Sequence, residues 1–169
     1  GDSTRVKDKL SSGVKTISNT KNNNSEYLVV NADEGKKVRA IIKYKDAQGF
    51  EETVPTSSAS IPYKDDGSGR FSIKGTAAVG NTLSIKEDAA DPDGKGTLSY
   101  SWETYSDNSG WKEVSTKSTY QVEAKEEGKK VRAIIKYKDE QGFEETVPTS
   151  SATIPVINDG KASFSIKGT

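Results

Sequence analysis

The sequence predicts an all-β protein built from tandem modules of about 93 residues, and three observations support this fold class. First, short segments such as residues 131–137 alternate apolar and polar side chains, which is the period of a half-buried strand. Second, glycine, asparagine and aspartate residues separate these segments, as expected for turns. Third, a long block of sequence recurs almost unchanged. Because no long segment follows the 3.6-residue helical period, the three observations together favour a repeated β-module.

The recurring block is nearly identical in its two copies. Residues 35–62 and 128–155 have the same amino acid at all but two of 28 positions. The offset of 93 residues continues to the sequence FSIKGT, which occurs at 71–76 and again at 164–169. A period of this length indicates tandem modules rather than a short-period solenoid.

The copies are not equally complete, and we expect the chain to be a window on a longer array. The predicted parts are an incomplete first module (1–62, with 1–25 divergent), a linker (63–70), a complete module (71–157), a linker (158–163) and the first strand of a truncated third module (164–169). An incomplete module exposes strand edges, which invite pairing with another chain. A strand-swapped oligomer that uses residues 164–169 is therefore one expected partner arrangement.

The complete module contains seven segments that we expect to be strands, each justified by alternating or β-branched residues and bounded by turn residues. They are 71–73, 82–85, 98–102, 111–114, 120–124, 131–137 and 143–147. The turns between them fall at 79–81, 93–96, 107–110, 126–128 and 141–142. Seven short strands in about 90 residues are typical of an immunoglobulin-like sandwich. We expect Trp102 on the third strand to be buried between the sheets, with Tyr137 close to it.

Composition argues against several classes of function. The 169 residues include no cysteine and no histidine, which removes thiol nucleophiles, disulfides, zinc fingers and imidazole bases. The 25 basic residues equal the 25 acidic ones, which argues against a nucleic-acid partner. No apolar run approaches the roughly 20 residues of a membrane span. The adjacent carboxylates Glu51-Glu52 and Glu144-Glu145 point to opposite faces of a strand, so they cannot act as a glycosidase pair. We expect a protein without catalytic activity.

Residues 71–157 and the later part of the first module resemble a known family. The sequences that carry the resemblance are Gly80-Asn81-Thr82-Leu83, Asp91-Pro92-Asp93-Gly94, Tyr100-Ser101-Trp102 and the run EEGKKV at 126–131. They are similar to the immunoglobulin-like, cadherin-like tandem repeats of giant cyanobacterial and marine bacterial surface adhesins, which often occur with hemolysin-type calcium-binding repeats. The resemblance implies an extracellular spacer or scaffold at the cell surface whose partners are neighbouring modules of the same chain.

Asp91 and Asp93 are the main candidate metal ligands. Two carboxylates at i and i+2 followed by glycine can surround a calcium ion with oxygen atoms. Lys95 stands where an EF-type loop would place another ligand, so further residues would have to complete the site. The related repeats place calcium at module junctions, where this chain has Asp65, Asp66, Asn158 and Asp159. The alternative is a solvated β-turn, for which Asp-Pro-Asp-Gly is well suited.

Other polar and aromatic residues have simpler interpretations. Asp46 and Asp139, each followed by Gln-Gly, are expected to form hairpin turns. Tyr105 and Trp111 are candidates for a glycan-binding platform, whereas Tyr100 and Trp102 share a face that we expect in the core. Two alternative functions stay open at this point: decoration of a phage virion, and a glycan-binding module.

Overall fold

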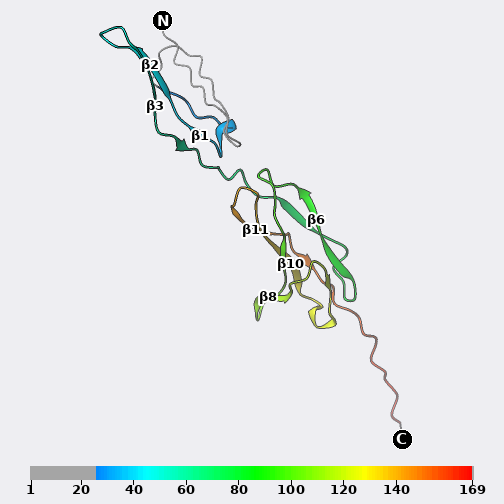
Figure 1. Ribbon diagram of the computed structural model, residues 1–169. Helices are drawn as coiled ribbons and strands as arrows, with labels where there is room; N and C mark the ends of the chain where they lie inside the picture. Colours follow the sequence, from blue (N-terminus) through cyan, green and yellow to red (C-terminus); the bar gives the residue numbers. More distant parts are fainter. Residues whose placement is uncertain (1–25, 169) are drawn as a thin grey trace. The chain divides into compact units, whose positions relative to one another are not determined.

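The computed structural model describes residues 26–168 and consists of antiparallel strands, turns and two short 3-10 helices (Figure 1). The chain divides into two compact units, Gly1–Lys64 (unit 1) and Asp65–Thr169 (unit 2). Every strand pair within residues 26–168 is antiparallel, so the all-β prediction is confirmed. Within the same residues, no helix has the length and apolar character needed to cross a membrane. The predicted divergence of residues 1–25 lies outside the described residues.

Unit 2 contains two sheets. Its strands are β5 (Arg70–Lys74), β6 (Thr82–Ala89), β7 (Ser99–Ser106), β8 (Gly110–Ser115), β9 (Tyr120–Gln121), β10 (Lys130–Lys138), β11 (Glu144–Pro148) and β12 (Ala152–Thr153). One sheet has the order β5-β6-β9, and the other has the order β11-β10-β7-β8 with β12 also paired to β10. A strand is found at each of the seven predicted segments. The fifth is the shortest, because helix η2 (Ala124–Glu126) follows soon after β9.

The C-terminal segment forms no strand among the described residues. Residues 164–168 are exposed and lie outside the sheets of the described chain, although the sequence FSIKG forms β5 at residues 71–75. The physical reason is that a strand needs a partner to satisfy its main-chain groups. β5 obtains that partner from β6.

The core of unit 2 lies between the two sheets. The alternation of β10 places Val131, Ala133, Ile135 and Tyr137 on one face, and all four are buried. The opposite sheet contributes further buried side chains to the same cluster, including Phe71, Leu83 and Tyr120. The predicted half-buried strand at 131–137 is therefore confirmed, and its apolar face is the one that packs on the other sheet.

Trp102 of β7 is fully buried, as the sequence predicts. Its ring packs against Tyr120 with the centroids 6.0 Å apart, and its Nε1–H donates to the Lys117 carbonyl oxygen at 2.9 Å. The expected neighbour Tyr137 packs edge-on against Phe71 instead, at 6.2 Å. The strand register explains the difference, because Ala133 is the residue of β10 opposite Trp102.

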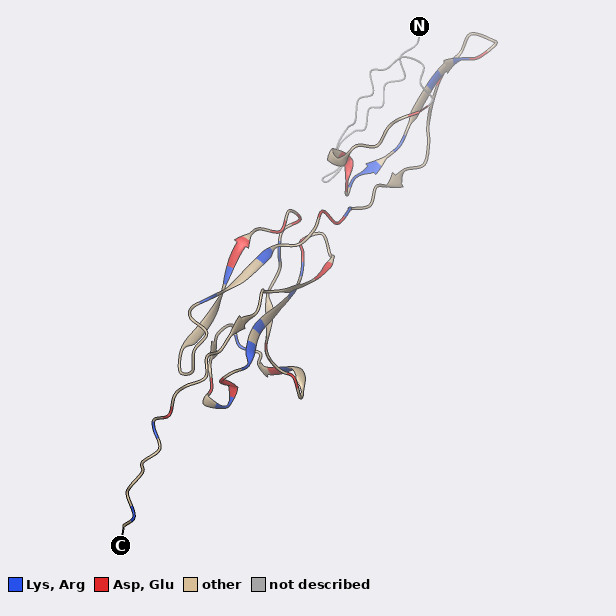
Figure 2. Ribbon diagram, turned by 180° about the vertical axis from the view of Figure 1, so that it is seen from behind, with Lys and Arg blue, Asp and Glu red and all other residues tan. Residues whose placement is uncertain are grey.

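Charged side chains on the outer faces pair across strands. Arg132 of β10 donates to Glu103 of β7 at 2.8 Å, and Lys138 lies 3.2 Å from Glu144 of β11. Basic and acidic segments are accordingly interspersed along the ribbons of both units (Figure 2). This arrangement agrees with the balanced charge of the chain.

Unit 1 repeats the local structure of the second half of unit 2. Its elements are η1 (Asn31–Asp33), β1 (Lys37–Val38), β2 (Ile41–Lys45), β3 (Glu51–Pro55) and β4 (Ala59–Ser60). β2 pairs with β3 in the register that β10 uses with β11. The Ala40 amide donates to the Thr56 hydroxyl at 3.0 Å, as the Ala133 amide does to Thr149. The near-identical sequence thus sets near-identical local hydrogen bonds.

The two copies differ in burial. Ile135 and Tyr137 are 0% and 4% exposed, whereas their counterparts Ile42 and Tyr44 are 48% and 50% exposed. In unit 2 the β5-β6-β9 sheet supplies the residues that pack on this face. Residues 26–64 contain no counterpart of the β5 or β6 sequences. Burial of these strands therefore depends on the second sheet and not on the strand sequence.

This contrast predicts that Ile135→Ala destabilises unit 2 by about 2–5 kcal/mol, the usual cost of removing a fully buried isoleucine side chain. Both tryptophans lie in unit 2, so denaturant unfolding followed by tryptophan fluorescence reports this unit. The matched variant Ile42→Ala should leave the tryptophan transition unchanged. A transition that moves equally in both variants would contradict the assignment of Ile135 to the core.

Candidate metal centre

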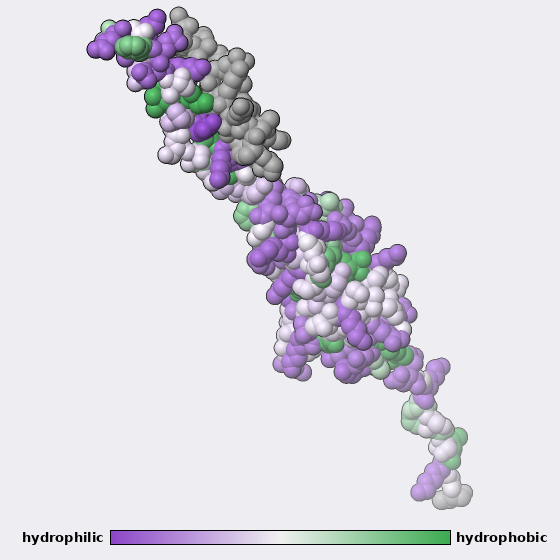
Figure 3. All heavy atoms as spheres, in the orientation of Figure 1, coloured by the Kyte–Doolittle hydropathy of each residue, from purple (hydrophilic) through white to green (hydrophobic). Residues whose placement is uncertain are grey.

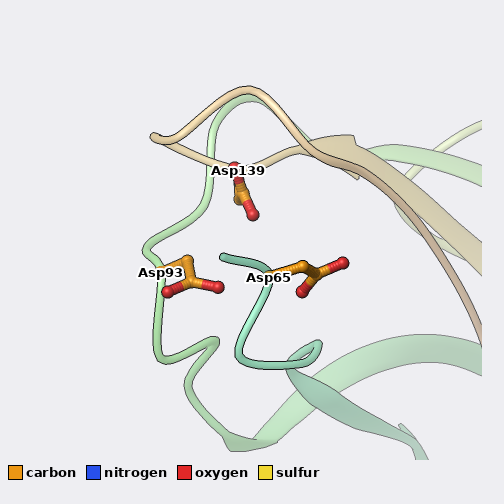
Figure 4. A group of neighbouring side chains, drawn as sticks. All are labelled: Asp65, Asp93 and Asp139. Atoms are coloured by element: carbon orange, nitrogen blue, oxygen red, sulfur yellow. The ribbon is translucent and has the colours of Figure 1, made fainter. Parts of the chain in front are cut away.

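Five carboxylates of unit 2 come together from separate segments of the chain. They form two overlapping groups, Asp65 with Asp93 and Asp139, and Asp91 with Asp139 and Glu145. Within each group, one carboxylate oxygen of every member lies within 4.8 Å of the others. Figure 4 shows the first group, in which the Asp139 carboxylate is directed from its strand toward the other two side chains.

Asp91 and Asp93 occupy the loop after β6, and both are buried. The Asp93 amide donates to Asp91 Oδ1 at 2.7 Å, and the Gly94 amide donates to the Asp91 carbonyl oxygen at 3.1 Å. The Tyr137 hydroxyl donates to Asp91 Oδ2 at 2.6 Å. The loop is therefore a turn, as one interpretation of the sequence predicts, and the same turn presents two buried carboxylates.

Asp65 reaches this loop from the segment before β5. The Gly67 amide donates to Asp65 Oδ1 at 2.9 Å, and the Asp66 amide donates to Asp93 Oδ2 at 2.6 Å. The structure thus places the Asp65 carboxylate beside the loop of Asp93. Asp66 takes part through its main-chain N–H, which binds the Asp93 carboxylate. The other two junctional candidates, Asn158 and Asp159, are exposed in the C-terminal segment, and Asp159 belongs to neither acidic group among the described residues.

Asp139 is the residue that connects the two groups. It directly follows β10, and its Oδ1 accepts hydrogen bonds from the amides of Gln141 and Phe143, each at 2.9 Å. The predicted hairpin turn is therefore present. The side chain is only 4% exposed, and within residues 26–168 its Oδ2 has no hydrogen-bond partner. A buried carboxylate oxygen is costly to leave without a partner, so this atom is a position at which a cation, a water molecule or another donor could bind.

Glu145 on β11 completes the second group. Loss of solvation raises the pKa of Glu145, and the negative charges of Asp65 and Asp91 raise it further. Burial and the hydrogen bond to Asp91 raise the pKa of the neighbouring Tyr137 to about 12. Several lysine and arginine side chains of unit 2 pair with other carboxylates, at Glu87, Glu103, Glu123, Glu126 and Glu144. The cluster therefore carries concentrated negative charge.

Two glycines allow the hairpin of Asp139 to approach the loop of Asp91 and Asp93. Gly94 has a φ of +82°, and a Cβ atom there would lie 2.5 Å from the Glu140 side chain. A Cβ atom on Gly96 would lie 2.6 Å from the Lys138 carbonyl oxygen, which accepts the Gly96 amide at 2.9 Å. The glycines of this loop therefore form the turn and also leave room for the hairpin to pack closely against it.

The sequence interpretation missed Asp139 and Glu145 as members of the cluster. Asp139 looks like a turn residue, and its counterpart Asp46 makes the same two hydrogen bonds in unit 1. Among the described residues, Asp46 belongs to neither acidic group. The available signal was Gly94 and Gly96, since paired glycines in a short loop indicate that another segment packs closely against it.

The geometry suits a hard divalent cation. All side-chain ligands are carboxylate oxygens, the donors that calcium and magnesium prefer. Calcium binds oxygen at about 2.3–2.6 Å, so one ion can contact several oxygens that lie within about 5 Å of one another. The carboxylates of each group are close enough together for this. The main-chain N–H bonds to Asp91, Asp93 and Asp139 hold these carboxylates in place before any ion binds.

The aromatic candidates lie elsewhere in unit 2. Tyr105 and Trp111 face each other across β7 and β8, with ring centroids 5.4 Å apart, and both are half-buried. The Arg132 guanidinium lies 4.0 Å from the Trp111 ring centroid and covers one face of it. A sugar ring would have to stack on the other face of Trp111 or displace Arg132.

Comparison with protein-family models, curated proteins and solved structures found no match for the chain.

Glu145 gives unit 2 a pH dependence when calcium is absent. Its pKa in the folded state lies above the ordinary value of 4.5, so the folded protein binds this proton more tightly than the unfolded chain. The free energy of unfolding should therefore fall as the pH rises from about 4.5 through the raised pKa. Urea unfolding in chelator, followed by tryptophan fluorescence across this range, measures the decline.

Glu145→Gln should flatten that decline, because glutamine does not ionise. The matched variant Glu52→Gln changes the corresponding, exposed residue of unit 1 and should leave the decline intact. A Glu145→Gln chain with the pH dependence of the unchanged protein would show that Glu145 is not the group responsible.

Proposed function

We propose that the chain is a non-catalytic repeat segment of a large extracellular surface adhesin, in which immunoglobulin-like modules act as spacers, and that unit 2 is stiffened by a calcium ion. The two antiparallel sheets around one core support the module type. The near-identical copies at an offset of 93 residues support a tandem array. The observation that carries the calcium proposal is the buried, unpartnered Oδ2 of Asp139 beside Asp65 and Asp93.

Electrostatics supports the bound ion. Without a cation, loss of solvation and, after it, repulsion by the neighbouring carboxylates raise the pKa of Glu145. A divalent cation removes the repulsion and supplies the partner that Asp139 Oδ2 lacks. Calcium suits the site better than magnesium, because it accepts several carboxylates in irregular geometry whereas magnesium retains most of its water.

The origin of the ligands supports a mechanical role. Asp65 precedes β5, Asp93 follows β6 and Asp139 follows β10, so one ion would tie three segments together. Asp65 is also the first residue of unit 2. An ion held there fixes the point at which the chain enters the module, which restricts the motion of the preceding linker. Stiffness of this kind suits a spacer.

Thermal unfolding of the full chain with calcium and with excess chelator tests this function. Calcium that binds only the folded state at 100 times its dissociation constant adds about 2.7 kcal/mol. For a domain of this size, the midpoint of the tryptophan transition should rise by roughly 10–20 °C. Asp139→Asn should abolish most of this rise, because it removes the charge and weakens the ligand.

The matched control is Asp46→Asn. The asparagine oxygen can still accept the two turn hydrogen bonds at either position, so both variants should keep their hairpins. Asp46→Asn should retain the full calcium response. A calcium response that persists in Asp139→Asn, or one that is absent from the unchanged chain, would refute the calcium site and leave Asp139 as a turn residue.

A further inference from the structure

Glu145 is a charged residue on the core-facing side of β11. The register of β10 and β11 places it directly opposite Tyr137, and directly paired residues project from the same face of a sheet. Val147, two residues further along β11, packs against the core from this face. Glu145 is partly buried, and among the described residues its Oε1 is buried without a hydrogen-bond partner. Such an oxygen is costly to leave without a cation, a water molecule or another donor.

Each of the two acidic groups contains a residue with an oxygen of this kind. In the first group, Asp65 and Asp93 surround Asp139, whose Oδ2 has no partner within residues 26–168. In the second group, Asp91 and Asp139 accompany Glu145, whose Oε1 has none. Asp139 belongs to both groups and is only 4% exposed. The proposed function uses the first group alone. The second group therefore has three carboxylates and an unpartnered oxygen that no ion yet accounts for.

The negative charge of the cluster exceeds what one divalent cation balances. One such ion offsets two of the five carboxylate charges in the two groups. Lys95 in the loop after β6 pairs with Glu87, and Lys138 at the end of β10 pairs with Glu144. Both lysines thus bind carboxylates outside the cluster. A second divalent cation would offset two more of the cluster's charges.

The Asp139 carboxylate has room for contacts with two ions. An ionised carboxylate has two oxygens with about four lone-pair positions. The amides of Gln141 and Phe143 both bind Oδ1, and Oδ2 accepts no hydrogen bond within residues 26–168. Two neighbouring cations can therefore share Oδ2. The Tyr137 hydroxyl holds Asp91, a further member of the second group, at 2.6 Å.

We propose that unit 2 binds a second calcium ion, held by Asp91, Asp139 and Glu145, next to the calcium ion held by Asp65, Asp93 and Asp139. This inference rests on the proposed function, because the two ions share Asp139. Its ligands are again carboxylate oxygens from separate segments, which suits calcium. The second ion adds β11 to the segments that the first ion connects. It binds more weakly than the first, because the first ion has already offset part of the negative charge.

The number of calcium ions bound by the full chain tests the inference. Equilibrium dialysis at constant ionic strength should show that the unchanged chain binds two ions more than Asp139→Asn and one ion more than Glu145→Gln. These differences cancel any calcium held elsewhere on the chain. The matched control is Glu144→Gln, which should bind as many ions as the unchanged chain. Glu144 is the neighbouring residue of β11, but it is exposed and pairs with Lys138 outside the cluster.

Lanthanide luminescence tests whether the two ions are neighbours. Terbium and holmium are hard trivalent cations that replace calcium at carboxylate sites, and excitation passes from terbium to holmium only over short distances. In a chain loaded with both metals, holmium should shorten the lifetime of terbium luminescence. Glu145→Gln should remove this shortening, because a single site holds one metal or the other. The fluorescence of buried Trp102 in each variant verifies that unit 2 is folded.

The outcomes separate this inference from the proposed function. If the unchanged chain binds one ion more than Asp139→Asn, the single calcium site stands and the second ion is refuted. If the two chains bind equal numbers of ions, both proposals fail. An equal count in Glu145→Gln and the unchanged chain would overturn the second ion, as would loss of an ion from Glu144→Gln. A terbium lifetime that holmium does not change would also overturn it, since the ions would then not be neighbours.

Discussion

The packing of the β5-β6-β9 sheet on the inner face of β10 is the interaction on which the rest of unit 2 depends. The burial of β2 and β10 can be compared directly, because the two strands share nearly the same sequence and the same hairpin register. Their turns and side-chain hydrogen bonds agree, yet only β10 is buried. Transfer of a side chain such as Ile135 from water contributes roughly 1.5–3 kcal/mol. The local sequence thus determines which residues form strands in this protein. Burial of those strands depends on packing against segments that are distant in sequence.

The carboxylate cluster is a product of the same packing. Tyr137 lies at the edge of the core, where its ring packs against Phe71. Its hydroxyl accepts a hydrogen bond from the Gly69 amide and donates one to the Asp91 carboxylate. This contact brings the loop after β6 and the segment before β5 to the end of β10, where Asp139 lies. Asp46 forms the same turn in unit 1 but belongs to neither acidic group among the described residues. The role of an aspartate in this repeat is therefore decided by the sheet that packs beside it.

This dependence explains which features the sequence could predict. Alternation and turn residues are local signals, and they located the strands of unit 2, the buried Trp102 and the loop of Asp91 and Asp93. Tyr137 and Asp91 are 46 residues apart, and no local pattern reports such a contact. For that reason Asp139 was interpreted as a turn residue alone, and Tyr137 was expected beside Trp102. Residues 164–168 illustrate the complementary case, since the sequence that forms β5 at 71–74 is in no sheet of the described chain where no partner strand lies beside it.

The carboxylates of the cluster are held in fixed positions and also repel one another. Main-chain N–H groups hold Asp91, Asp93 and Asp139 in fixed positions, so little ordering remains to be done when a cation binds. The same rigidity prevents the carboxylates from moving apart, so their repulsion persists in the ion-free state, where it adds to the loss of solvation that raises the pKa of Glu145. In the proposed calcium-bound state, relief of this repulsion would add to the affinity for the cation. The stability of the folded state would then respond to the cation, because the unfolded chain can separate its charges freely. On this proposal, unit 2 is more stable where calcium is abundant than where it is scarce.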